Sequence, residues 1–316
     1  MNSPSISVAI PLHNEERNVP ELFRRVAGVL DHMPGGPHEM LFVDDGSSDR
    51  TLALLEEFAG RDQRVSVISL SRNFGHQAAL AASLDHVSGD VTVILDGDLQ
   101  DTPETIPLFV AKHLEGYDVV YAQRLRRKEA LWLRICFFLF YRLMANLSDM
   151  NLPLDAGDFG LMSRRVVDQL KSMPEHDRYL RGLRSWVGFR QIGIPVERAE
   201  RFAGQSKYGL LKYLKLASDA IFSFSVIPIR AAAVLGSAGV MLSLLFSLYS
   251  VLAKLIFHQS PKGFTALLLM ITFLSAILLL FLGIIGEYVG RIYEEVKARP
   301  VYVIGKKIGG FARRRN

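Results

Sequence analysis

The sequence predicts an α/β domain with a mainly parallel sheet, followed by two membrane-spanning helices. In the first half of the chain, apolar runs that begin about 25–35 residues apart alternate with helical patterns. In the last third, two long runs carry no charged residue. Apolar residues make up 49% of the 316 residues and the mean hydropathy is +0.20, which excludes a disordered chain and indicates membrane spans.

Short apolar runs are the predicted strands: Ile6–Leu12, Met40–Val43, Val65–Leu70, Val91–Leu95 and Asp118–Ala122. Between the first two, apolar residues from 19 to 30 fall on one helical face. Continuous apolar strands that alternate with helices indicate a parallel sheet covered on both faces. Such sheets bind ligands at the carboxyl ends of their strands.

Acidic residues follow three of these strands. They are Glu15 and Glu16, then Asp44 and Asp45, then Asp96 and Asp98. Carboxylates crowded at one edge repel one another unless a positive group lies among them, and divalent cations prefer oxygen ligands. Asp96-Gly97-Asp98 therefore predicts a cation that bridges phosphate oxygens. Ser48 and Asp49 are explained as well by capping of a helix alone.

The chain lacks the glycine-rich phosphate loops of P-loop NTPases and of dinucleotide oxidoreductases. Its one cysteine, Cys136, excludes an internal disulfide and a cysteine-cluster metal site. The remaining interpretation is a nucleotide-diphosphate site that neutralises the phosphates with a metal and cationic side chains.

The uncharged runs Ala231–Ala253 and Gly263–Gly286 each reach about 35 Å as helices, enough for a hydrocarbon core of about 30 Å. The five residues 258–262 join them, so we expect a hairpin; two buried core helices are the alternative. From Arg291 onward eight basic and two acidic residues follow, which places both ends of the hairpin in the cytoplasm.

The expected division is a cytoplasmic catalytic domain over 1–228, two membrane helices at about 229–257 and 263–288 within 229–290, and a basic tail over 291–316. Because the tail follows a membrane span, we expect it to bind lipid headgroups, and we expect no nucleic-acid partner. Basic and aromatic stretches at 125–147 and 207–226 predict helices in the membrane interface, with ordinary core helices as the alternative.

Several motifs in this order resemble the family 2 glycosyltransferases of GT-A fold. They are Val8–Glu16, Val43–Asp49, Leu70–Gly75, Asp96–Gln100, Gly157-Asp158-Phe159, Arg201–Tyr208 and Gly286–Tyr293. Together with the terminal hairpin they resemble the polyprenyl-phosphate glycosyltransferases, a group that includes bactoprenol glucosyltransferase and dolichol-phosphate mannose synthase. His13 stands where tyrosine is common in that family.

The resemblance implies a reaction at the cytoplasmic face of a bacterial inner membrane, in the modification of cell-envelope glycans. A sugar passes from a nucleotide diphosphate to a polyprenyl phosphate such as undecaprenyl phosphate. The resemblance also implies site residues. Asp96, Asp98 and Gln100 hold Mg²⁺ or Mn²⁺; Pro11, His13, Glu15, Asp44, Asp45 and Gly97 line the nucleotide-sugar; and Arg201 and Lys207 close on its diphosphate.

Asp158 matches the position of the family's base, with Asp155 as the alternative. Since a phosphate monoester is already largely anionic at neutral pH, Asp158 either removes a residual proton or orients the sugar. Arg124 and Arg134 are the candidates for holding the acceptor phosphate, whose direct attack on the sugar predicts inversion. We expect Asp98 to stabilise the leaving diphosphate through the metal.

Two other functions are compatible with parts of the sequence. A processive polysaccharide synthase shares the donor motifs, but the Gln-x-x-Arg-Trp motif of such enzymes is absent. A non-catalytic membrane scaffold that kept the fold has no need of the intact acidic and basic motifs. Glucose from UDP-glucose is the first choice of donor; mannose, galactose, N-acetylhexosamine and aminoarabinose, a guanine base, and a homo-oligomer remain open.

Overall fold

The computed structural model describes residues 3–124, 156–176, 178–196, 227–257 and 263–310. In chain order its strands and helices are β1 (Ile6–Leu12), α1 (Val19–Asp31), β2 (Glu39–Asp44), α2 (Thr51–Arg61), β3 (Val65–Leu70), α3 (His76–His86), β4 (Val91–Ile94), η1 (Pro103–Thr105), α4 (Ile106–Leu114), β5 (Val119–Arg124), β6 (Ala156–Ser163), α6 (Arg164–Ser172), α7 (Leu180–Trp186), β7 (Gln191–Val196), α9 (Ile227–Phe257), α10 (Phe264–Lys297) and β8 (Ile304–Gly309). The chain falls into two units, residues 1–208 with 299–316, and residues 209–298.

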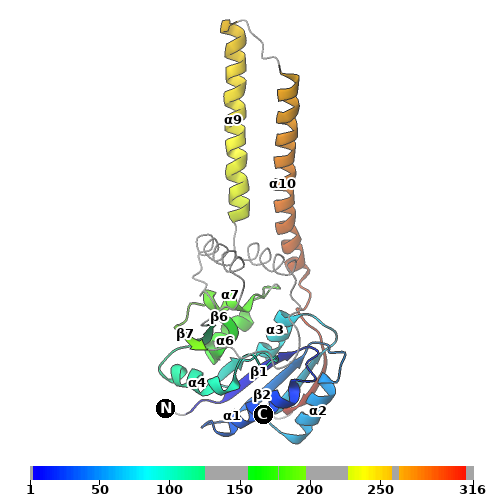
Figure 1. The fold of residues 1–316 in the computed structure, drawn as a ribbon, viewed down its shortest axis with the longest axis vertical. Helices are drawn as coiled ribbons and strands as arrows, with labels where there is room; N and C mark the ends of the chain where they lie inside the picture. Colours follow the sequence, from blue (N-terminus) through cyan, green and yellow to red (C-terminus); the bar gives the residue numbers. More distant parts are fainter. Residues whose placement is uncertain (1–2, 125–155, 177, 197–226, 258–262, 311–316) are drawn as a thin grey trace. The chain divides into compact units, whose positions relative to one another are not determined.

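In the first unit, the described strands form one eight-stranded sheet in the order β7-β5-β6-β4-β1-β2-β3-β8. Figure 1 shows β1 and β2 next to each other in this sheet. Neighbours among β1 to β4 pair in parallel, while β6 and β8 run antiparallel to their neighbours. The predicted, mainly parallel α/β sheet is confirmed. All five predicted strands are present, with bounds that differ by at most two residues at either end.

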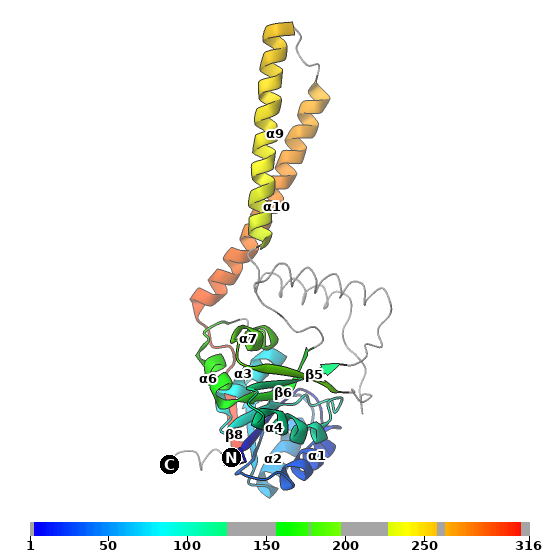
Figure 2. The same ribbon diagram turned by 90° about the vertical axis from the view of Figure 1, so that its left-hand side faces the viewer.

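Helices cover both faces of this sheet, as the continuous apolar strands predict. Figure 2 shows α3, α6 and α7 on one face and α1, α2 and α4 on the other. The Phe23 and Phe58 rings of α1 and α2 stack with their centroids 4.3 Å apart. Phe109 of α4 meets Phe159 of β6 at 4.9 Å, and both are buried. Each of the two buried rings, Phe109 and Phe159, contributes roughly 2–3 kcal/mol by burial.

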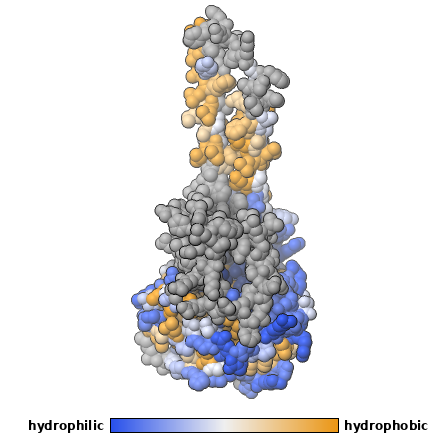
Figure 3. Space-filling model, in the orientation of Figure 1, coloured by the Kyte–Doolittle hydropathy of each residue, from blue (hydrophilic) through white to orange (hydrophobic). Residues whose placement is uncertain are grey.

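The second unit contains the two long helices α9 and α10, which pack against each other, with Phe281 of α10 close to Gly236 of α9. Large apolar side chains are exposed along both helices, as Figure 3 shows. Among the described residues, one segment, Met270–Lys297 of α10, is long and apolar enough to cross a membrane, with a mean hydropathy of 2.2. The apolar part of α9, Ala232–Phe246, is shorter, so two membrane spans stay a prediction.

The C-terminal region differs from the basic tail expected over 291–316. α10 continues to Lys297, and Ile304–Gly309 is strand β8 at the edge of the main sheet. Basic side chains on this strand pair with helices instead of standing free: Lys306 Nζ lies 2.7 Å from Glu56 of α2. The physical reason is that the edge of β3 needs backbone partners, and charged side chains are well tolerated on an edge strand.

The boundary between the two units falls at residue 208 instead of 228. The two stretches predicted to lie in the membrane interface, 125–147 and 207–226, lie outside the described residues.

Candidate active site

The carboxyl ends of β1, β2 and β4 meet at one edge of the sheet, and the acidic motifs follow them there. β1 and β2 are in register from Ser7↔Glu39 to Leu12↔Asp44. β1 also pairs with β4 up to Ala9↔Ile94. The backbone N–H of Asp45 donates to the Leu12 carbonyl at 2.8 Å, which continues the ladder into the loops. The expected convergence of these motifs at one sheet edge is therefore present.

Asp45 is the centre of a group of three loops. Its carboxylate accepts hydrogen bonds from the backbone N–H groups of Phe74 at 2.7 Å and Gly75 at 2.9 Å. Its carbonyl oxygen lies 2.9 Å from Nδ1 of His13, whose Nε2 lies 3.0 Å from Nδ2 of Asn73. These partners assign the proton of His13 to Nδ1. The loops after β1, β2 and β3 are thus held together, with His13 and Asn73 exposed on their surface.

Asp44 lies under this surface and is 1% exposed. Its carboxylate accepts hydrogen bonds from the Ser69 hydroxyl at 3.1 Å and from the Ser47 N–H at 3.3 Å. Because Asp44 is buried, it supports the loops, whereas a ligand can reach the neighbouring exposed side chains. Burial also affects Asp45, since it raises the pKa of Asp45 more than the hydrogen bonds from Phe74 and Gly75 lower it.

Gly46 allows two of these loops to approach closely. Its φ is +62°, and a Cβ atom there would lie 2.4 Å from the backbone carbon of Arg72. Asn14 and Glu15 complete the connection: the Ser48 N–H donates to Asn14 Oδ1 at 2.8 Å, and the Glu15 N–H donates to Thr51 Oγ1 at 2.9 Å. Asp49 accepts hydrogen bonds from Thr51 N–H at the start of α2 and from Glu16 N–H, so it links two loops as well as supporting a helix start.

Asp96 and Asp158 approach each other because β4 and β6 are antiparallel. Ile94 pairs with Gly160, so the residue two positions after Ile94 lies near the residue two positions before Gly160. His76, the first residue of α3, lies between them: its Nε2 is 3.7 Å from Asp96 Oδ1 and 3.8 Å from Asp158 Oδ2. Burial lowers the pKa of His76, but the two carboxylates outweigh it and the net shift is upward.

Arg181 of α7 binds Asp158 through both of its oxygens. Nε donates to Oδ1 at 2.8 Å and Nη2 donates to Oδ2 at 2.7 Å. Burial opposes the charge of Asp158, but Arg181 and His76 together hold its pKa far below the ordinary range. Asp158 is therefore an ionised, fully engaged carboxylate, which is a poor proton acceptor.

Arg184, one helical turn after Arg181, is also buried, with 3% exposure. Nη2 donates to the Gly157 carbonyl at 3.3 Å, and the guanidinium lies 5.1 Å from the centre of the Tyr121 ring. Burial lowers the pKa of Arg184 to about 10. Arg184 fixes the backbone beside Asp158 and adds a second positive charge behind it.

The oxygen donors at Asp96 and Asp98 fit a hard divalent cation. Oδ1 of Asp96 is buried and accepts no hydrogen bond from the described residues, and burial raises the pKa of Asp96, so a cation beside this oxygen would stabilise its ionised form. A Cβ atom on Gly97 would lie 2.1 Å from Leu12 Cδ2, so a larger residue at this position would require the buried Leu12 side chain to move. Among the described residues, no group of three or more His, Cys, Asp or Glu side chains is arranged to hold a metal by itself. Oxygens from Gln100 and from a bound diphosphate are needed to complete such a site.

The structure thus brings together Pro11, His13, Glu15, Asp44 and Asp45 around the first three loops, and Asp96, Gly97, Asp98, Gln100 and Asp158 around β4 and β6. Arg134, Arg201, Lys207 and the alternative base Asp155 lie outside the described residues. The backbone of Arg124 ends β5, where it pairs with Val196.

Sequence reasoning missed His76, Arg181 and Arg184. His76 directly follows the Leu70–Gly75 motif, so its place at the start of a helix after a strand could have indicated it. Arg181 and Arg184 carry no such signal, because their partners lie more than twenty residues away in the chain.

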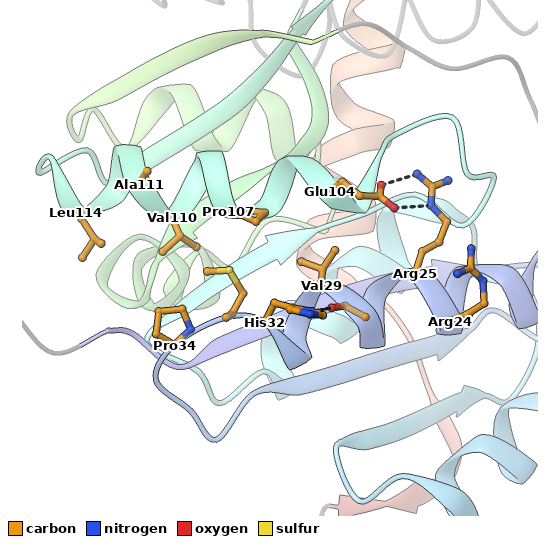
Figure 4. Close-up of a pocket in the computed structure, with 12 residues that line it drawn as sticks. Arg24, Arg25, Val29, His32, Pro34, Glu104, Pro107, Val110, Ala111 and Leu114 are labelled. Carbon is orange, nitrogen blue, oxygen red and sulfur yellow. Dashed lines mark hydrogen bonds and ion pairs between the residues drawn. The ribbon is translucent and has the colours of Figure 1, made fainter.

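A groove of about 650 Å³ lies away from this site, between α1 and the η1–α4 segment (Figure 4). Its wall is mainly apolar, with Val29 and Val110 among its residues, and the Arg25–Glu104 ion pair stands at its rim. Its two arginines, Arg24 and Arg25, are paired with Glu21 and Glu104, so the loops at the sheet edge are the better candidate site for a nucleotide.

Comparison with known proteins identifies the family of this chain. Glycosyl transferase family 2 matches residues 7–171, more than half of the chain. The uncharacterized glycosyltransferase YkcC of Bacillus subtilis (strain 168) is 42% identical over 307 residues, which cover 96% of this chain and 94% of that protein. A bactoprenol glucosyl transferase of Shigella phage SfII is 38% identical over 313 residues, which cover 96% and 99%.

Among solved structures, this chain is similar to glucosyl-3-phosphoglycerate synthase from Mycobacterium tuberculosis in complex with Mn²⁺, UDP-glucose and phosphoglyceric acid. The TM-score is 0.49 and the identity 22%, over 69% of this chain and 78% of that one.

Proposed function

The chain belongs to glycosyl transferase family 2 and is a glycosyltransferase, and from that premise we propose that it transfers a sugar from a nucleotide-sugar to a polyprenyl phosphate. The observation that carries this proposal is the convergence of Asp96 and Asp98 with the Asp45–His13–Asn73 loops at one sheet edge. Similarity to bactoprenol glucosyl transferases over nearly the full length supports a polyprenyl phosphate as acceptor and glucose as the sugar. UDP-glucose is our first choice of donor.

In this proposal the donor nucleotide binds across the loops after β1, β2 and β3. Pro11, His13 and Glu15 line the base and ribose, with Asp44 and Asp45 holding the loops in place. The exposed ring of His13 has its Nε2 beside Asn73, so both side chains can present polar atoms to a base. Arg201 and Lys207 contribute positive charge to the diphosphate, as the resemblance implies.

Asp96, Asp98 and Gln100 would hold Mg²⁺ or Mn²⁺, which supplies positive charge to the departing diphosphate. The buried Oδ1 of Asp96, which accepts no hydrogen bond and lies 3.7 Å from His76 Nε2, supports this assignment. His76 lies on the protein side of the same carboxylate, where it offsets part of the negative charge.

The acceptor needs little help to become a nucleophile, because the second pKa of a phosphate monoester is near 6. Attack by its oxygen on the anomeric carbon forms the new bond as the bond to the nucleoside diphosphate breaks, and the configuration inverts. Arg124 and Arg134 hold the acceptor phosphate against the repulsion of the donor. Asp158, already ionised and held by Arg181, orients the sugar in this scheme and takes no proton.

We place the enzyme in a bacterial plasma membrane with its catalytic unit in the cytoplasm. The apolar segment Met270–Lys297, none of it buried inside the protein, supports a membrane anchor. α9 as a second span and the basic residues after the hairpin support a cytoplasmic catalytic unit. Stretches 125–147 and 207–226 would then lie at the membrane interface, and a homo-oligomer is compatible with such an anchor.

The proposal is tested with detergent-purified protein, Mg²⁺ or Mn²⁺, undecaprenyl phosphate and a panel of radiolabelled sugar nucleotides. We expect label from one donor, first UDP-glucose, to enter the organic phase, and to be lost with EDTA. Incorporation without added lipid phosphate would instead indicate a polymerising synthase. Absence of both transfer and nucleotide binding would contradict the enzyme and favour a scaffold.

A further inference from the structure

The segment that follows α10 in the chain is built into the catalytic sheet beside the donor loops. β8 pairs antiparallel with β3 from Ser66↔Gly309 to Leu70↔Ile304. Beyond the ladder, the Ser71 N–H donates to the Val303 carbonyl at 2.9 Å. Residues 303–309 therefore fix the backbone of the last residues of β3 and of the first residue of the loop that follows.

That loop is the one that Asp45 holds. It carries Asn73, which contacts His13, and the N–H groups of Phe74 and Gly75, which donate to Asp45. Ser69, which donates its hydroxyl to Asp44, is itself paired with Lys306 of β8. The C-terminal segment thus supports the partners of both aspartates that follow β2.

The same segment also contacts the C-terminal end of α3. The Tyr302 hydroxyl donates to Asp85 Oδ2 at 2.8 Å, and its ring lies edge-on to His86 with the centroids 6.4 Å apart. Lys307 Nζ lies 2.9 Å from His86 Nε2. Because α3 begins at His76, between Asp96 and Asp158, its placement sets one wall of the site.

An edge strand that only covers the sheet needs its ladder and nothing more. Tyr302 and Val303 precede the first residue of that ladder, yet each makes a hydrogen bond. Tyr302 contacts Asp85 of α3, and Val303 contacts Ser71, the first residue of the loop after β3. Burial and the hydrogen bond to Asp85 both raise the pKa of the Tyr302 hydroxyl, so it stays protonated and donates.

We propose that Tyr302 and the Val303–Gly309 segment are positioning residues of the donor site, which hold the Ser71–Gly75 loop and α3 in the geometry that binds nucleotide. The inference rests on the proposed function, because it assigns the nucleotide to these loops. It makes the C-terminal residues after the α10 helix necessary for donor binding.

The first test measures binding of UDP, and separately of GDP, to the full chain in detergent with Mn²⁺ by calorimetry. In Tyr302→Phe, we expect the Kd of the bound nucleotide to rise about three- to tenfold, less than the full effect of a hydrogen bond to a charged group because Tyr302 acts on the nucleotide through α3. The KM for the nucleotide-sugar rises equally, while kcat and the KM for the lipid acceptor stay unchanged. If Tyr302 served stability alone, the variant would have a lower Tm, but the KM for the nucleotide-sugar would not rise selectively.

Tyr117→Phe is the matched control. It also removes a tyrosine hydroxyl, but Tyr117 lies between α4 and β5, where the Arg190 guanidinium is 4.2 Å from the centre of its ring. Its Kd should equal that of the wild type. The inference is overturned if the wild type binds nucleotide and the Kd of Tyr302→Phe stays within twofold of the wild-type value. It is also overturned if both variants raise the Kd equally. In either case the proposed function is unaffected. If the wild type binds neither nucleotide, the proposed function fails and the inference fails with it.

Two shortened chains provide a second test. Ending the chain after Gly310 keeps β8 but removes Arg313, Arg314 and Arg315, whereas ending it after Pro300 removes β8. We expect wild-type nucleotide binding from the longer chain, and a loss of at least about tenfold from the shorter one, with faster hydrogen exchange confined to residues 69–86. Equal binding by both overturns the inference, and Tyr302→Phe decides the matter if the shorter chain does not fold.

Discussion

Arg181 and Asp158 form a bidentate ion pair, with Nε 2.8 Å from Oδ1 and Nη2 2.7 Å from Oδ2. The Asp158 side chain is 4% exposed and that of Arg181 is 32% exposed. A carboxylate so placed is ionised and keeps its orientation. This pair is the reason that we assign Asp158 a role in holding the sugar instead of a role in accepting a proton.

Arg181→Ala leaves the Asp158 charge buried without its partner. We expect the free energy of unfolding to fall by about 2–3 kcal/mol, less than the roughly 3–5 kcal/mol for a broken, fully buried pair, because Arg181 is partly exposed. Arg181→Lys, which keeps the charge but loses the bidentate geometry, should lose less. In a double-mutant cycle with Asp158→Asn measured by denaturation in detergent, additive effects of the two changes would show that the pair is not coupled.

The same pair makes stability depend on pH in one direction. The folded-state pKa of Asp158 lies below its ordinary value of 3.8, so its contribution to stability is complete above that value. The contribution is lost as the pH falls toward the folded-state pKa. The difference in unfolding free energy between the wild type and Asp158→Asn should therefore stay constant from about pH 8 to pH 5 and shrink below about pH 4. A difference that grows on acidification would contradict the assignment.

Asp98→Ala should abolish metal-dependent transfer. Removal of a carboxylate from a pair that flanks one cation should reduce the rate of sugar transfer by at least about 100-fold, and EDTA should do the same to the wild type. Glu57→Ala is the control, because Glu57 lies on the surface of α2 in an ion pair with Arg61. Activity of Asp98→Ala close to that of the control would remove Asp98 from the site.

Gly46→Ala should disturb the contact between the donor loops. The new Cβ meets the backbone of Arg72, and the φ of +62° disfavours alanine, so we expect a loss of about 2–4 kcal/mol in unfolding free energy and a higher KM for the nucleotide-sugar. Gly28→Ala on α1, where no atom lies within 4 Å of the new Cβ, should be neutral or stabilising by up to about 1 kcal/mol. Similar unfolding midpoints for the two variants would argue against the close approach.

Leu274→Arg should weaken membrane anchoring. Leu274 lies near the middle of the uncharged run 263–286, where an arginine costs about 3 kcal/mol on insertion. We expect a smaller share of the chain in carbonate-washed membranes. Val296→Arg, at the polar end of α10 beside Glu294 and Glu295, should fractionate as the wild type does. Equal retention of both variants would argue against α10 as an anchor.

The sequence alone predicted the GT-A-type α/β sheet, its first five strands and the acidic motifs at their carboxyl ends, and the structure and the family confirm these. It could do so because apolar periodicity and the residues that follow a strand are local features of the chain. The sequence also predicted the long apolar helix α10, since composition over about twenty residues decides whether a helix can span a membrane.

Only the tertiary structure decided which distant side chains meet. His76 reaches Asp96 because α3 crosses the sheet, and Arg181 reaches Asp158 because α7 packs on β6. The end of the chain is the clearest case: its basic residues indicated a tail that binds lipid headgroups, yet Ile304–Gly309 is an edge strand. A strand at an edge is defined by the backbone groups that its neighbour leaves unpaired, and a partner more than 200 residues away leaves no mark in the local pattern.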